Sequence, residues 1–354
     1  MSKPFGLMAD LHLHAWSSFS KIEPSGLNSR LAGLLREIYR AAQVVHEAGG
    51  DQIIMAGDVF HVRGSVAPSV LNATCDTLYK CNLDFGTKFL IIPGNHDLEG
   101  KDSTRLGSAV TALEGSFVAV RNETYLDEDT GVVMVPWFES IPALKVELEK
   151  WAPKEKGGCD AIIHAPIDGV IPGLPAHGLD PEYLASLGYR RVFAGHYHNH
   201  KRFEGGIYSI GALAHHTWSD VSTRAGFLLV TEKEVSWRKS HLPEFVDMTK
   251  LTEFEPEEIP AIVDKNYVRM RVEASKLKDV EDARAELVAM GAAGVLVQAE
   301  PKPPAEAVRA TGHTIKSGAS LEVSVTEFIK TMSSVDAAQV AAEALNVLGA
   351  VGDK

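Results

Sequence analysis

Short apolar runs, each bounded by Gly, Pro, Asp or His, recur through the first two-thirds of the chain. Runs of this length with such boundaries are typical of buried strands. Six of them lie at residues 5–9, 52–56, 88–92, 132–135, 161–163 and 191–194. After Gly205-Gly206 the runs at 207–212, 225–230 and 234–238 predict hairpin-like strands that close the same domain.

Segments with the apolar spacing of a helix lie between several of these predicted strands. Apolar residues recur every three or four positions from Leu27 to Val45, and Gly49-Gly50 end the pattern. Asp180-Pro181 reads as the N-cap and first position of a short helix that ends near Gly188. Strands that alternate with helices predict a layered α/β domain.

The pattern changes after residue 243. Acidic residues dominate 244–258, which predicts a solvated connector, and 267–272 alternates as a strand with Arg269 and Arg271 on its polar face. A helix near 280–290 and a strand at 294–298 complete a small α+β module. We therefore expect a domain at 1–243, a capping module at 244–300, a proline-rich linker at 301–304 and a helical tail at 305–354. The tail carries two apolar helical stripes, one made of Leu321, Val325, Phe328, Ile329 and Met332 and the other of Val335, Ala338, Ala342 and Leu345.

Composition narrows the class of protein. Lys+Arg 35 against Asp+Glu 47 gives a net charge of −12. This charge excludes a protein that binds nucleic acid through an overall positive charge, so any DNA or RNA site must be a local basic patch on an acidic surface. The 3 cysteines form no CxxC pair, which favours a reducing compartment, the cytoplasm. The chain carries neither a signal-peptide pattern nor an apolar run long enough to span a membrane, so we expect no membrane partner.

Polar motifs follow five of the apolar runs directly. Because the carboxyl ends of strands in an α/β sheet meet at one edge, we expect their side chains to converge. The motifs are Asp10-Leu11-His12, Gly57-Asp58-Val59-Phe60-His61, Gly94-Asn95-His96-Asp97, His164 and Gly195-His196-Tyr197-His198. Carboxylates, an amide oxygen and several imidazoles suit a pair of divalent transition-metal ions, and two such ions can clamp a phosphodiester. His177, in a Gly/Pro-rich loop, is the rival of His164 as a ligand.

In this order the motifs DxH, GDxxH, GNHD, a lone His and GHxH resemble the calcineurin-like metallophosphoesterases over residues 5–240. The resemblance implies a four-layer sandwich of two mixed sheets flanked by helices. It implies one metal ion held by Asp10, His12, Asp58 and His198. The second ion would share Asp58 and take Asn95, His164 and His196. His96 would face the scissile phosphate and be oriented by Asp97.

Finer features resemble the DNA-processing branch of that family, the SbcD-type nuclease subunits. They are Gly57-Asp58-Val59-Phe60-His61 followed by Pro68-Ser69, and the strands at 207–212 and 225–230. The branch implies a DNA nuclease that uses two Mn²⁺ ions (Mg²⁺ as the other choice). It also implies a homodimer within a heterotetramer that contains an SbcC-type coiled-coil ATPase, to which the tail would bind. His61 either contacts substrate or only bonds within its loop. Arg63, Lys101 and Arg105 are placed to contact phosphates, and we also expect Arg269 and Arg271, on the polar face of the strand at 267–272, to meet DNA phosphates.

Two other functions stay open. A small-molecule or cyclic-nucleotide phosphodiesterase would use the same metal ligands and need neither cap nor partner tail. A non-catalytic scaffold that tethers DNA would tolerate the loss of ligands, and the ligand set here is complete. Two structural questions also stay open: the tail stripes either bind a partner or dock on their own chain, and His215-His216 with Trp218 either stack a nucleotide or pack within a loop.

Overall fold

A computed structural model describes residues 3–100, 103–250, 254–272, 277–299, 340 and 342–344 of the chain. Lys101, the linker at 301–304, the tail stripe Leu321, Val325, Phe328, Ile329 and Met332, and Val335, Ala338 and Leu345 of the second stripe lie outside the described residues. None of the described helices combines the length and the apolar character that crossing a bilayer requires.

The first sheet has six strands in the order β12-β11-β1-β2-β3-β4. Its parallel part consists of β1 (Phe5–Met8), β2 (Gln52–Ala56), β3 (Lys88–Ile92) and β4 (Val118–Val120). The hairpin of β11 (Gly226–Val230) and β12 (Val235–Lys239) joins antiparallel to β1. The strands β1, β2 and β3 end at the same edge of the sheet, because Met8 pairs with Met55 and Ala56 with Ile92.

The second sheet also has six strands, in the order β5-β6-β7-β8-β10-β9. Its parallel strands are β6 (Val132–Val135), β7 (Asp160–His164), β8 (Val192–Gly195) and β10 (Ile207–Ser209). The edge strands β5 (Tyr125–Asp127) and β9 (Lys201–Phe203) are antiparallel. Two mixed sheets with helices confirm the predicted α/β class.

One apolar core lies between the two sheets. It contains Leu7 and Ile54 from the first sheet together with Ile162 and Phe193 from the second, all of them fully buried. The residues of β1 and β2 that point the other way, Met8 and Ile53, pack with the helices α1 and α2 in a second cluster. A third cluster joins the far face of the second sheet to the helices α3 and α4.

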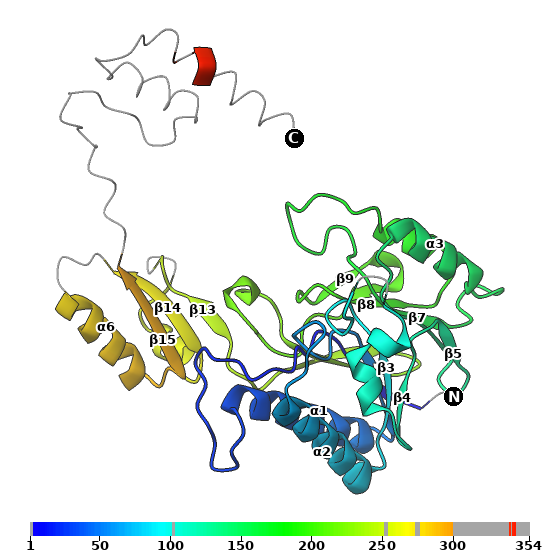
Figure 1. Cartoon of the computed structure of the whole chain (residues 1–354), viewed down its shortest axis with the longest axis horizontal. Helices are drawn as coiled ribbons and strands as arrows, with labels where there is room; N and C mark the ends of the chain where they lie inside the picture. The colour runs from blue at the N-terminus through cyan, green and yellow to red at the C-terminus, as the bar shows by residue number, and fades with distance from the viewer. Residues whose placement is uncertain are drawn as a thin grey trace. The chain divides into compact units, whose positions relative to one another are not determined.

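The helices follow their predicted signals in part. The helix α1 (Ser29–Glu47) begins at Asn28, whose side chain accepts hydrogen bonds from the backbone of Arg30 and Leu31, and α4 (Pro181–Ser186) begins at the predicted cap Asp180. Two further helices, α2 (Pro68–Phe85) and α3 (Ile141–Lys150), were not predicted. In Figure 1, α1 and α2 lie side by side on the first sheet.

The third sheet corrects one expectation. The predicted connector at 244–258 contains β13 (Phe245–Asp247), which pairs in parallel with β14 (Tyr267–Val272), and Phe245 and Met248 are buried. Tyr267 is buried too, at 7% exposure, although its position in the alternating strand placed it on the polar face. The sheet is completed by β15 (Gly294–Ala299), and the described part of this region also contains the helices α5 (Ile259–Val263) and α6 (Leu277–Ala289).

Most of the chain forms one compact unit, Met1–Met270 with Ala283–Leu296, which contains all of the predicted metal ligands. The second unit comprises Arg271–Asp282 and Val297–Lys354. The domain boundaries predicted after residue 243 and at 301–304 stay predictions.

Candidate metal centre

The predicted ligands come from the carboxyl ends of five strands, three in the first sheet and two in the second. Asp10 and His12 follow β1, Asp58 follows β2 and Asn95 follows β3. His164 ends β7, and His196 and His198 follow β8. The two sheets face each other, so both sets of strand ends meet in one place.

The backbone at this place is unusual. Asp10, His12, Asp58 and His196 have φ of 50°, 43°, 52° and 104°, in the left-handed region that side chains rarely adopt. The glycine at position 94 is required by close approach, because a Cβ there would lie 2.2 Å from the Asp58 Oδ1 atom. Conformations of this cost persist at functional sites, where the surrounding structure enforces them.

Three groups of donor atoms result among the described residues: two consist of predicted ligands, and the third is His12 with His61 and His96. In the first, Asp10, His12 and His198 each offer one atom, and these atoms lie within 4.8 Å of one another. The Nε2 atoms of His12 and His198 are 3.2 Å apart, and Asp58 Oδ2 lies 3.8 Å from His12 Nε2.

In the second group, Asp58, His164 and His196 meet in the same way. His164 Nε2 lies 3.4 Å from Asp58 Oδ1 and 3.3 Å from Asn95 Oδ1, and His196 Nδ1 lies 2.9 Å from the same amide oxygen. The two oxygens of Asp58 therefore face different groups, as a bridging carboxylate requires.

The hydrogen bonds behind these imidazoles fix which nitrogen faces the centre. His164 Nδ1 donates to the carbonyl of Ala56 at 2.8 Å, and His198 Nδ1 donates to Asp220 Oδ1 at 2.6 Å. Both Nε2 atoms are thereby left with a lone pair for a metal ion. Donors bonded at about 2.0–2.1 Å to a shared ion stand roughly 3.0–3.4 Å apart, close to the separations found here. The donor set therefore fits two divalent ions that share Asp58.

The electrostatics of the metal-free centre are those of a site built for cations. Burial acts to raise the pKa of Asp58, but the adjacent His164 and His12 outweigh it and hold that pKa below its usual value. Burial also acts to lower the pKa of His164, but Asp58 and Asp10 outweigh it and raise that pKa to about 9. Burial and the neighbouring His164 lower the pKa of His196 to about 3. The acidic groups thus hold a proton on His164 that a metal ion would displace.

Comparison with known proteins decides the family. The family model of calcineurin-like phosphoesterases matches residues 3–200. The chain is a calcineurin-like phosphoesterase. A phosphoesterase of this family is a metal-dependent hydrolase of phosphate esters, which is the chemistry that the donor set supports.

Other comparisons add little to this family assignment. No curated protein matches the phosphoesterase. Among solved structures, a dimetal phosphatase from Danio rerio aligns with 68% of this chain and 97% of its own, at 11% identity and a TM-score of 0.40. An L-ribulose 3-epimerase aligns with 97% of this chain and 92% of its own, at 13% identity and a TM-score of 0.17. Likenesses of this size carry no argument about activity.

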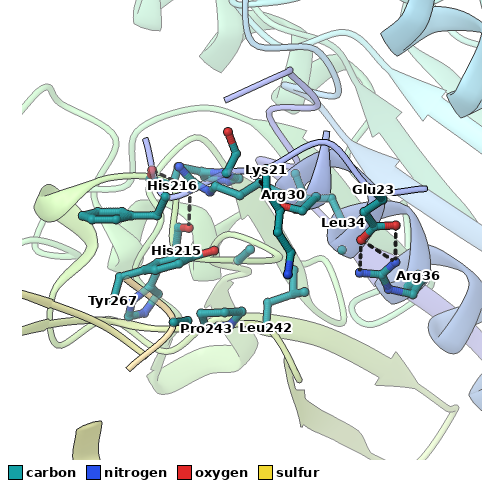
Figure 2. Close-up of a pocket in the computed structure, with 16 residues that line it drawn as sticks. Lys21, Glu23, Arg30, Leu34, Arg36, His215, His216, Leu242, Pro243 and Tyr267 are labelled. Carbon is teal, nitrogen blue, oxygen red and sulfur yellow. Dashed lines mark hydrogen bonds and ion pairs between the residues drawn. The ribbon is translucent and has the colours of Figure 1, made fainter. Parts of the chain in front are cut away.

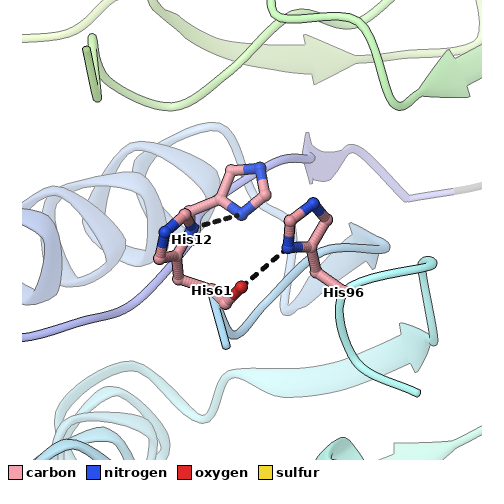
Figure 3. A group of neighbouring side chains, drawn as sticks. All are labelled: His12, His61 and His96. Carbon is pink, nitrogen blue, oxygen red and sulfur yellow. Dashed lines mark hydrogen bonds between the residues drawn. The ribbon is translucent and has the colours of Figure 1, made fainter. Parts of the chain in front are cut away.

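His96 lies beside the metal centre of the phosphoesterase, and Figure 3 shows it with His12 and His61. Its backbone N–H donates to Asp58 Oδ1 at 2.8 Å, and its Nδ1 donates to the carbonyl of His61 at 2.7 Å. Its Nε2 is the ring nitrogen left for chemistry. The ring of His61 lies parallel to that of His96, with 5.7 Å between the centroids, and packs on Trp16 at 4.4 Å.

The side chain of Asp97 bonds to backbone groups, whereas it was expected to orient His96. Its buried carboxylate accepts hydrogen bonds from the backbone of Val59, Phe60 and Gly94, so it joins the loop after β2 to the loop after β3. Burial and the nearby Asp58 raise the pKa of Asp97 to about 7. The structure orients the His96 ring through the carbonyl of His61, where Asp97 was expected to do so.

Supporting residues were missed by the sequence analysis. His216 Nε2 donates to the carbonyl of Asp10 at 2.9 Å, and Asp220 accepts from the backbone of His216 and Thr217 as well as from His198. Figure 2 shows a pocket of about 580 Å³ that is lined by His215, His216 and Arg30, and Arg30 donates to the carbonyl of His216 at 2.8 Å. His215 and His216 are 4% and 2% exposed, so they pack within the loop and do not stack a nucleotide.

The arginines expected to contact DNA differ in exposure and in whether a carboxylate already pairs with them. Arg63 is exposed in the loop that follows His61, and Arg271 is exposed in β14. Arg105 forms an ion pair with Glu114, and Arg269 forms one with Asp247 while lying 4.7 Å from the Trp218 ring. Arg269 is therefore engaged within its own unit, whereas Arg63 has no side-chain partner among the described residues and can meet a phosphate. His177, the rival of His164, is exposed, and its backbone N–H donates to Asp168.

Proposed function

We propose that this phosphoesterase is a Mn²⁺-dependent DNA nuclease subunit that cleaves phosphodiester bonds as an exonuclease or endonuclease in DNA end processing. We further propose that it works in the cytoplasm as a homodimer joined to an SbcC-type ATPase through residues 305–354. The observation that carries the proposal is the bond from His96 Nδ1 to the carbonyl of His61. It ties the GDxFH motif of the DNA-processing branch directly to the histidine expected to face the phosphate.

The residues of the chain would divide the work as follows. Asp10, His12, Asp58 and His198 would hold one ion, and Asp58, Asn95, His164 and His196 the other. Bound divalent ions would supply a Lewis-acid clamp on the phosphodiester. His96, with Nδ1–H held by a carbonyl, would present Nε2 to the leaving oxygen and transfer a proton to it when the imidazole is charged. Arg63 would bind a neighbouring phosphate through its guanidinium.

The charge balance of the chain favours a second function, a small-molecule or cyclic-nucleotide phosphodiesterase. Arg105 and Arg269 are already paired with carboxylates, and the chain as a whole is acidic. A small-molecule or cyclic-nucleotide phosphodiesterase needs only the scissile phosphate and would tolerate this charge balance.

One assay separates the two functions. The metal-loaded chain is given linear duplex DNA, a cyclic nucleotide and bis(p-nitrophenyl) phosphate in the presence of Mn²⁺, with and without the ATPase and ATP. We expect hydrolysis of DNA, with Arg63→Ala impairing it more than hydrolysis of the small ester. Lys88→Ala is the matched control, since Lys88 is an exposed cation at the start of β3, away from the strand ends that carry the ligands. Rapid turnover of the cyclic nucleotide with no cleavage of DNA would instead support the second function.

A further inference from the structure

A second polar pocket lies on the flank of the first sheet. Its volume is about 450 Å³, and it is formed by the loop that follows the GNHD motif and the segment that joins β4 to β5. Ser103, Thr104 and Arg105 line it from the loop, and Arg121 and Asn122 from the segment. Hydroxyl, amide and guanidinium groups therefore gather in one hollow.

The pocket lies at the edge of the sheets that carries the metal centre. The backbone N–H of Arg121 donates at 2.7 Å to the carbonyl of Ile91, in the strand that leads into Asn95 and His96. On the other sheet, Tyr125 pairs with Met134, near the end of the strand that leads to Trp137. Trp137 in turn stacks on the ligand His196, with ring centroids 5.3 Å apart. Each wall of the pocket is thus connected to residues of the metal centre, one through the strand β3 and the other through the strand β6 and Trp137.

Arg121 is the group in this pocket that lacks a counter-charge. Its guanidinium lies 4.0 Å from the Tyr125 ring centroid, and its Nε atom is buried without a hydrogen-bond partner, as is Asn122 Oδ1. Within the described ranges no carboxylate lies at ion-pair distance from Arg121. Glu123 also lines the pocket but is exposed and does not pair with Arg121.

The other half-buried arginines that the structure describes in the same unit each bind a carboxylate, and so does the buried Arg191; Arg269, whose Nε also has no partner, pairs with Asp247. Arg190 and Arg191 both bind Asp160, at 2.8 and 2.5 Å, and Arg40 binds Glu37 at 2.6 Å. A partly desolvated guanidinium is stabilised by an anion that accepts its hydrogen bonds. Ser103, Thr104 and Asn122 line the pocket with neutral polar groups, and its one carboxylate, Glu123, does not pair with Arg121, so an anionic ligand can supply the partner that Arg121 lacks within the described ranges.

We propose that this pocket binds a non-scissile phosphate of the nucleic-acid strand whose scissile phosphate lies at the metal centre. The proposal rests on the proposed function. Arg121 contacts the phosphate oxygens, Ser103 and Thr104 donate hydroxyl hydrogen bonds, and the Tyr125 ring holds the guanidinium in place. The pocket thereby makes affinity depend on substrate length.

The test measures binding to the metal-loaded full chain in a His96→Ser background, by fluorescence anisotropy. Probes are labelled single-stranded oligonucleotides of increasing length and a dinucleoside monophosphate, which offers only the scissile phosphate. We expect Arg121→Ala to raise Kd about tenfold for the longer probes and to reduce the salt slope by about one, with no change for the dinucleoside. Arg121→Lys should restore the salt slope. Arg238→Ala is the matched control, since Arg238 is exposed on β12, the opposite edge strand.

A second measurement locates the phosphate. Each phosphate of the long probe is replaced in turn by a neutral methylphosphonate, and the Arg121→Ala effect should vanish at one position only. If Arg121→Ala fails to fold, Asn122→Asp, which places a negative charge in the pocket, should weaken the same probes.

Unchanged affinity and salt slope in these variants would overturn the inference, even if the wild-type chain cleaves DNA. Length-dependent binding that needs Arg121, together with an absence of DNA cleavage, would overturn the proposed nuclease function and leave the phosphate pocket standing.

Discussion

The Nδ1 atom of His96 donates to the main-chain carbonyl of His61 at 2.7 Å, across the loops that follow β3 and β2. A carbonyl cannot give up a proton, so this bond fixes the tautomer of His96 and leaves Nε2 as its reactive nitrogen. The bond depends on the backbone of His61, while the side chain of His61 packs on Trp16 and places its Nδ1 3.4 Å from the Nδ1 of His12 (Figure 3).

Replacing His96 should therefore affect turnover without affecting metal content. We expect His96→Ser to lower kcat by about 10²–10⁴-fold, the usual contribution of a positioned acid or base. Elemental analysis should find the same two ions as in the wild-type chain, because no metal-site donor is removed. Loss of metal from this variant would show that His96 is a ligand instead.

Asp58 should behave in the opposite way, because its two oxygens face both donor groups. We expect Asp58→Asn to lose bridging charge, to bind both ions weakly and to abolish hydrolysis. Calorimetric titration with Mn²⁺ measures this directly. A variant that still binds two ions with wild-type affinity would contradict the bridging role.

The pH dependence of metal loading follows from the charge on the imidazoles. The pKa of His164 is raised to about 9, against the opposing effect of burial, by Asp58 and Asp10, and the pKa of His198 is raised by its bond to Asp220. The His164 ring is protonated in the metal-free chain at pH 7 and must lose a proton to bind a metal, and the raised pKa of His198, which burial opposes, acts in the same direction. Loading should therefore release protons, and Mn²⁺ affinity should rise with pH up to about 9. Calorimetry in buffers of different ionisation enthalpy counts the protons, and an affinity independent of pH would refute this.

Asp220 should control metal affinity from behind His198. Its carboxylate accepts the Nδ1–H of His198 at 2.6 Å, so Asp220→Asn should weaken metal binding by about 10–100-fold, the range found for such supporting partners. Asp168→Asn is the matched control, since Asp168 accepts backbone bonds from the loop at His177 and Gly178 and touches no ligand. Equal metal affinities in the two variants would show that Asp220 does not support metal binding through His198.

The core between the sheets should be sensitive to a single truncation. Phe193 is fully buried there and stacks on Tyr208 with centroids 5.0 Å apart. Phe193→Ala should lower the free energy of unfolding by about 3–5 kcal/mol. Chemical denaturation monitored by circular dichroism measures the change, and a loss below about 1 kcal/mol would mean that the sheets close around the cavity.

Those parts of the fold that repeat a simple pattern could be predicted from the sequence. The strands β2 and β3 are continuous apolar runs because both of their faces are covered, and α1 shows a broad apolar stripe. The helix α2 buries only Val70, Thr74, Leu78 and Cys81, so its stripe is narrow and interrupted by polar residues. The strand β13 was hidden because it is three residues long and lies in an acidic segment.

The candidate site likewise has one part that the sequence could predict, the metal ligands, and one part that it could not, the residues that support them. The ligand positions carry their signal locally, since each polar group follows a strand end directly. Asp220, His216 and Arg30 act through contacts that only the folded chain creates: Arg30 meets His216 across 186 positions and His216 meets Asp10 across 206. No spacing within the sequence encodes such partners, so sequence reasoning could not identify them.

The left-handed backbone at Asp10, His12, Asp58 and His196 gives the metal centre an evolutionary consequence. Each such residue costs of the order of 1–3 kcal/mol, which glycine at the same position would largely avoid. In a descendant of this chain that no longer needed hydrolysis, metal binding would no longer maintain the backbone cost at these four positions, and glycine there would relieve it. Persistence of the four residues in a lineage would mark an active enzyme, and glycine at these positions would mark a relative that has kept the fold and abandoned the chemistry.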